Sequence, residues 1–156
     1  MRQNETAIRS PWGTHVPRPR LVIALAILVL MSACAGNKRS DSLTQTLTAY
    51  HATMRWGDFQ RALEFVDPDY REAHPLSAIA RARYRQVRVV GYDEGGGPAA
   101  SADGEVRQVV KISLVNLHTQ RERFVIDRQV WKWDPLAERW WLTTGLPDIT
   151  GSPASD

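Results

Sequence analysis

The spacing of apolar residues changes once along the chain, near residue 85, and this change constrains the fold more than any other feature. Before it, apolar residues recur at helical spacing, as in Leu43, Leu47 and Tyr50. After it they alternate with polar residues, as in Ile112 and Leu114. Helices followed by strands predict an α+β domain, with N-terminal helices packed on one face of a curved antiparallel sheet of about four strands.

Local signals set the expected bounds of these elements. Ser42 and Gln45 have the spacing of a capping box and are expected to begin the first helix. Gly57 is placed to end that helix, and Asp58 to cap the next one. We expect helices over 42–55, 58–66 and 75–83, strands over 85–92, 105–117, 121–133 and 139–144, a single domain over 42–148, and a disordered tail over 149–156.

An unbroken apolar run of eleven residues, Leu21 to Met31, precedes this domain. As a helix it would rise about 16 Å, roughly half of a hydrocarbon core, which is typical of the apolar part of a signal peptide. Arg18 and Arg20 supply positive charge before the run, and the small residues Ser32-Ala33 lead into Cys34, the sole cysteine. The segment resembles a bacterial lipoprotein signal peptide.

The resemblance implies cleavage between Ala33 and Cys34 and a diacylglyceryl thioether on Cys34. Residues 1–33 would then be the signal peptide, and residues 34–41 the lipidated cysteine and a short tether. Ala35 and Gly36 follow the cysteine with no aspartate, which in enteric-type bacteria implies the outer membrane, facing the periplasm. Two alternatives stay open: an inert Cys34 behind a merely secretory or uncleaved run, and a translation start downstream of Met1.

Charge and composition narrow the function classes. Residues 1–33 hold four arginines and one glutamate, whereas residues 34–156 hold 16 basic and 16 acidic residues. The exported part is therefore neutral, and its charge gives no argument for nucleic acid. A single cysteine excludes an intramolecular disulfide and a Cys-rich zinc site, and His51, His74 and His118 lack the i, i+4 spacing of a helical metal site. We expect neither metal nor cofactor.

Two stretches carry a second resemblance. WGDFQRALEFVDP joins two expected helices through Gly-Asp, and WKWDPLAERWWLTTGLP places tryptophans around a short turn between the last strands. With the order of elements, they make residues 42–147 similar to the nuclear transport factor two-like fold, shared with ketosteroid isomerase and polyketide cyclase-like proteins. The resemblance implies a cone-shaped domain. Since that fold hosts both enzymes and binding modules, it does not decide between them.

Two residues are candidates for an acid or base inside such a cone. Asp127 lies in the middle of an expected strand, where an acid is unusual, and His51 lies near the end of the first helix. An ion pair between Asp127 and Arg128, or an arginine of a neighbouring strand, is the structural alternative.

Two further sets are candidates for a binding surface. The first comprises four arginines within eight residues, Arg81, Arg83, Arg85 and Arg88, which could meet anionic lipid head groups or form a solvated face. The second is the sheet face that carries Trp131 and Trp133; Trp140 and Trp141 point to opposite faces of the next strand. Simple cross-strand packing of the tryptophans is the alternative.

The sequence thus predicts a cell-envelope lipoprotein with a non-catalytic, periplasm-facing domain for ligand binding, protein binding or assembly. Its expected partners are the membrane, through the lipid anchor, and a protein or a second copy of the chain, through the sheet face. The alternative is a small-molecule enzyme of the polyketide cyclase or ketosteroid isomerase type, with a pocket inside the cone. The sequence does not identify the ligand or the oligomeric state.

Overall fold

The computed structural model describes residues 38–101 and 104–149. The expected signal peptide with Ala33 and Cys34, and all of the expected tail beyond Ile149, lie outside these residues.

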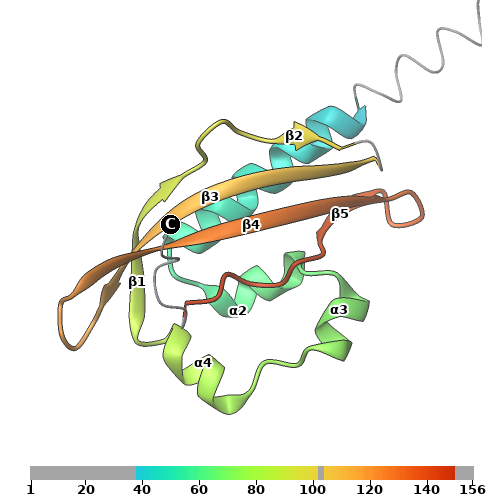
Figure 1. The fold of residues 1–156 in the computed structure, drawn as a ribbon. Coiled ribbons are helices and arrows are strands. Elements are labelled where there is room, and N and C mark those ends of the chain that lie inside the picture. Colours follow the sequence, from blue (N-terminus) through green and yellow to red (C-terminus); the bar gives the residue numbers. More distant parts are fainter. Residues whose placement is uncertain (1–37, 102–103, 150–156) are drawn as a thin grey trace, which may run out of the picture. The chain divides into compact units, whose positions relative to one another are not determined.

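A strongly curled antiparallel sheet forms one layer of the domain. Its main strands are β1 (Val87–Asp93), β3 (Glu105–Asn116), β4 (Glu122–Asp134) and β5 (Arg139–Leu142), in the order β1-β3-β4-β5. The short β2 (Ala99–Ala100) pairs with the start of β3. β3 and β4 form a long hairpin that runs the length of this half-barrel (Figure 1).

Helices form the second layer. Residues 38–55 are helical, and α2 (Phe59–Ala62), the 3-10 turn η1 (Leu63–Phe65), α3 (Pro68–Ala73) and α4 (Ala78–Tyr84) follow. α2, α3 and α4 lie together on one side of the sheet (Figure 1). The architecture is therefore α+β, with N-terminal helices on a curled antiparallel sheet, as the change of spacing predicts.

The core lies between the helices and the inner face of the sheet. Tyr50 and Met54 from the first helix are fully buried, as are Ile112, Leu114 and Trp131 from the long hairpin. The strand residues belong to the buried half of a strict alternation, which runs through β3 and most of β4. The sheet consequently has an inner face against the helices and an outer face that they do not cover.

Apart from shifts of a few residues at the ends of elements, three details differ from the sequence-based predictions. Residue 38 is already helical, so Ser42 is an interior helix residue and the capping-box interpretation is wrong. Asp67 does not only end a helix: its Oδ1 accepts a hydrogen bond from the Tyr70 amide and so begins α3, which the sequence analysis missed. Ile149, assigned to the tail, is buried against the core. The cap formed by Asp58, which accepts from the Arg61 amide, is as expected.

No helix among residues 38–101 and 104–149 is long and apolar enough to cross a membrane.

Trp131 provides a direct test of this core. It is fully buried, so replacing it with alanine removes a large amount of buried apolar surface and leaves a cavity, and we expect Trp131→Ala to lower the free energy of unfolding by about 3–5 kcal/mol. Trp56 is 88% exposed, so Trp56→Ala should change the free energy of unfolding by less than about 0.5 kcal/mol. Denaturant unfolding measures both, and equal midpoints for the two variants would contradict the placement of Trp131.

Candidate functional site

The structure places Trp131 and Trp133 on the inner face of the sheet. Trp131 is fully buried and meets the ring of Tyr50 edge-on, with 5.3 Å between the ring centroids. Trp133 is half-buried and packs across the strands on Trp140, with 5.6 Å between centroids. Trp131 was predicted to lie on a binding surface, but its side chain is fully buried, so a partner that approaches the domain does not contact it. Trp133 and Trp140 pack against each other across the strands, as in the alternative interpretation.

The four arginines of residues 81–88 do not form one surface. Arg81 and Arg85 line one cavity, and Arg83 lines another together with Arg123. Arg88 lies on β1, among its outward-facing, exposed positions. The chain changes from helix to strand within this stretch, so a set that looks continuous in sequence is divided among three places.

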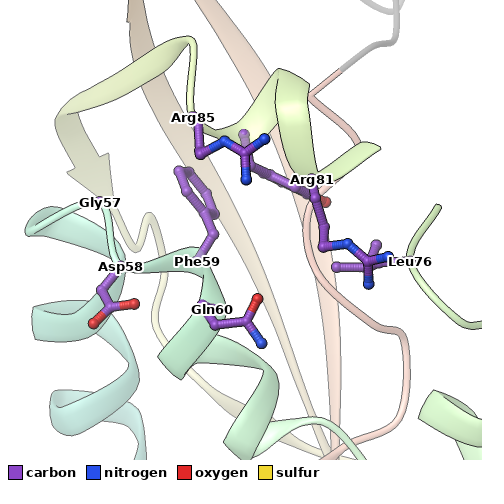
Figure 2. Close-up of a pocket in the computed structure, with 8 residues that line it drawn as sticks. Gly57, Asp58, Phe59, Gln60, Leu76, Arg81 and Arg85 are labelled. Carbon is purple, nitrogen blue, oxygen red and sulfur yellow. The ribbon is translucent and has the colours of Figure 1, made fainter. Parts of the chain in front are cut away.

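The cavity at Arg81 and Arg85 has a volume of about 310 Å³. It lies between α4 and the junction of the first helix with α2, the segment that contains Gly57 and Asp58 (Figure 2). A volume near 300 Å³ is at the lower end of the range of small-molecule sites. The sequence Trp56-Gly57-Asp58 shapes this junction: Gly57 has φ +72°, a conformation that favours glycine, and Asp58 caps α2.

The lining of this cavity has an apolar part and a cationic part. Phe59, Leu76 and Tyr84 supply apolar surface, and Phe59 packs on Tyr84 with 4.7 Å between ring centroids. The Tyr84 hydroxyl donates to the Pro147 carbonyl at 2.9 Å, so it is not free to bind a ligand, and burial raises its pKa to about 12. The guanidinium groups of Arg81 and Arg85 extend into the same space (Figure 2).

Neither guanidinium has a carboxylate partner within the described part of the chain. Asp58 lines the same cavity, but its Oδ2 lies 3.8 Å from Arg61 Nε and its Oδ1 accepts from the Arg61 amide. Two arginines are therefore available to an anion at the rim of an apolar cavity. Arginine suits this role because its planar guanidinium donates paired hydrogen bonds to carboxylates and phosphates.

A second group of polar side chains lies on the inner face of the curled sheet. Asp127 is 7% exposed, and its Oδ2 accepts a hydrogen bond from Gln129 Nε2 at 2.7 Å. Gln129 Nε2 also lies 3.0 Å from the Tyr92 hydroxyl, and Gln129 Oε1 accepts from Trp131 Nε1 at 3.2 Å. The expected ion pair of Asp127 with an arginine is replaced by this contact with an amide.

Burial dominates the electrostatics of this interior group. It raises the pKa of Asp127 from 3.8 to about 6, although the hydrogen bond from Gln129 lowers it. Burial also raises the pKa values of Tyr50 and Tyr92 well above the usual tyrosine value. Within the described residues, two buried polar atoms lack a hydrogen-bond partner, the Tyr50 hydroxyl and Gln108 Oε1. The space between the helices and the sheet thus holds a polar group that is only partly hydrogen-bonded.

His51, the other candidate base, lies at the border of this group. Its ring stacks on Tyr92, with 4.3 Å between centroids, and its Nδ1 lies 3.2 Å from Glu94 Oε1. Both His51 and Glu94 are partly exposed. The structure therefore connects His51 with Asp127 only indirectly, through Tyr92 and Gln129.

Four residues of this interior group, Tyr50, Tyr92, Gln108 and Gln129, were not predicted from the sequence as site residues. A signal for two of them was present, because Gln108 and Gln129 occupy the inward positions of the alternating strands. Polar residues at such positions mark a buried polar group. Tyr92 could not be found this way, since an irregularity between Val89 and Gly91 shifts the alternation of β1 before it.

No cluster of three or more histidine, cysteine, aspartate or glutamate side chains that could hold a metal ion occurs in residues 38–101 and 104–149. Comparison of the chain with protein-family models, curated proteins and solved structures gives no match.

The raised pKa of Asp127 predicts a specific dependence of stability on pH. As the pH rises from about 4 to about 6, the unfolded chain has lost the proton of Asp127 while the folded chain still holds it. The free energy of unfolding should therefore fall over this window, by up to about 3 kcal/mol from this group alone.

Asp127→Asn removes the titrating group and keeps a side chain of the same shape. Subtracting the unfolding free energies of this variant from those of the wild type, measured by denaturant titration at each pH, isolates the contribution of Asp127. A difference that does not change between about pH 4 and pH 6 would show that the carboxyl is not buried as described.

Proposed function

We propose that the chain is a lipid-anchored protein of the bacterial cell envelope, outer-membrane and periplasm-facing, whose domain binds a small amphiphilic anion without catalysing a reaction. The anchor is supported by the apolar run, the small residues before Cys34 and the single cysteine. The domain has the helices-then-curled-sheet order of the nuclear transport factor two-like fold, and we assign it to that fold on this ground.

The observation that carries the binding function is the cavity of Arg81 and Arg85. An apolar body would cover Phe59 and Leu76, while a carboxylate or phosphate would lie between the two guanidinium groups. The one carboxylate of this lining, Asp58, is engaged by Arg61: its Oδ1 accepts from the Arg61 amide and its Oδ2 lies 3.8 Å from Arg61 Nε. We therefore place a binding site, and not a reaction, in this cavity.

A fluorescent amphiphilic anion, anilinonaphthalene sulfonate, tests this site. We expect it to bind the native protein, and Arg81→Gln with Arg85→Gln to weaken binding by about tenfold or more, since each lost charge-assisted hydrogen bond contributes more than 1 kcal/mol. The matched control is Arg55→Gln with Arg71→Gln, which removes the same charge from exposed helical positions and should leave binding unchanged.

Because the probe also binds unfolded protein, circular dichroism of each variant checks that the variant is folded. Equal losses in the test pair and the control pair would show that the probe responds to net charge alone. Unchanged binding in the test pair would remove the cavity as the site.

The anchor needs its own experiment. Labelling cells with palmitate should mark the wild-type chain, and mass spectrometry should find Cys34 as the N-terminal residue with a diacylglyceryl group. Cys34→Ser should abolish the label, because the variant lacks the sulfur atom to which the diacylglyceryl group would be joined. A bare sulfhydryl, or a chain that still contains residues 1–33, would contradict the envelope assignment.

The interior group favours a second candidate function, a small-molecule enzyme with Asp127 as the base. A buried carboxyl with a pKa near 6 accepts a proton close to neutral pH, and the unpartnered Tyr50 hydroxyl could donate to a substrate. The Asp127→Asn variant separates the two functions. An enzyme would lose turnover, whereas anion binding at Arg81 and Arg85 would be unchanged.

A further inference from the structure

The outer face of the sheet carries an arrangement that neither the cavity nor the interior group uses. Four exposed hydrophobic side chains lie on it, Val90, Val109, Phe124 and Ile126. They face away from the helices, because the core residues of the same strands occupy the alternate positions. Exposed apolar side chains gathered on one face indicate a surface that meets another body.

The strand register opposes these and other apolar residues to cations. Directly opposed residues point to the same face, and four such pairs each join one apolar side chain with one cation: Arg88–Val115, Arg107–Val130, Val109–Arg128 and Lys111–Ile126. Lys111 also holds its ammonium group over the ring of Phe124, 4.7 Å from the centroid. The face is thus a regular mixture of apolar groups and positive charge.

Carboxylates on this face lie at its borders. Glu105 forms an ion pair with Arg107 at 3.6 Å, Asp93 is opposite Lys111 on β1, and Glu122 is opposite Val115 at the far end of the hairpin. Within the described residues, no carboxylate lies within ion-pair distance of Arg88, Lys111 or Arg128. The centre of the face is therefore positive as well as apolar.

This chemistry matches an anionic lipid surface. Aromatic and aliphatic side chains enter the boundary between head groups and acyl chains, while lysine and arginine remain among the phosphates. A second copy of the chain fits less well, because a two-fold dimer through this face would bring its cations against the same cations. An acidic protein would match the charge but would not need an apolar group opposite each of these cations.

The position of the proposed anchor supports the same occupant. Five Cα-to-Cα steps separate Cys34 from Arg39, which limits the span to about 19 Å. Arg39 donates to the Gly104 carbonyl at 2.9 Å, and Gly104 directly precedes β3. The chain thus enters the domain at the same end of the hairpin as Arg107 and Lys132, although Arg39 itself lies on the inner face, over the rings of Trp133 and Trp140. We propose that the outer face of the sheet docks on the anionic lipid surface that holds the anchor, an inference that rests in part on the proposed lipidation.

Photo-crosslinking of the full-length, processed protein tests the docking. Benzoylphenylalanine replaces Phe124 in one variant and Trp56 in a control, since Trp56 is exposed but follows the helix that packs on the other face of the sheet. Both variants are mixed with vesicles of phosphatidylcholine alone and with vesicles that also contain phosphatidylglycerol. We expect lipid adducts at residue 124, several-fold more with phosphatidylglycerol, and few at residue 56.

Charge variants test whether the cations direct the docking. Lys111→Gln with Arg128→Gln should reduce the lipid adducts at residue 124 several-fold, whereas Arg55→Gln with Arg71→Gln, on the helical side, should not. Equal adducts at residues 124 and 56, a crosslinked dimer, or a crosslink to another protein would overturn the proposal. The mass of the purified chain reports lipidation separately, so a missing anchor and a face that does not dock give different results.

Discussion

The register of the β3–β4 hairpin is the constraint on which the rest of the structure depends. The two strands are opposed from Glu105–Lys132 to Val115–Glu122, and their side chains alternate between the two faces. A slip of one residue would exchange the faces. A slip of β3 would bring Lys111 against the helices and expose Ile112, and a slip of β4 would do the same with Arg128 and Trp131, so the burial of the apolar set fixes the register. The same register creates the regular mixture of charges and apolar groups outside.

The interior polar group is the exception to this apolar inner face. Asp127 and Gln129 occupy positions where an apolar pair would pack with less desolvation cost. Their hydrogen bond reduces that cost only in part, since the pKa of Asp127 stays raised to about 6. A partly satisfied polar group in a core is unfavourable for stability, and such groups occur frequently at sites with a function. This is the physical reason to retain the inner face of the sheet as a second candidate site.

The sequence was sufficient to predict the fold class and the main strands, because these follow from the alternation of β3 and β4 and from the turns beside them. It did not predict α3, because Pro68 looked like the end of a helix when it is the first residue of one. Among the site residues, Arg81 and Arg85 could be identified as a set, but the cavity beside them depends on Phe59 and Leu76 from other segments. Tertiary packing, and not the local spacing of residues, decides which segments meet to form such a cavity.

The division of the arginine set also explains how one short stretch serves two surfaces. Arg81 and Arg85 are four residues apart, so on α4 and its C-cap they share a side, the side of the cavity. Arg88 follows the change to β1, where the two-residue alternation turns it to the outer face opposite Val115. Keeping exposed arginines without partners costs little stability because water solvates them, whereas their electrostatic attraction for an anion extends several ångströms. The two surfaces are therefore suited to different anions. The two arginines beside the apolar cavity suit a small anion that the cavity encloses, whereas the cations spread among apolar residues on the sheet suit an extended anionic surface.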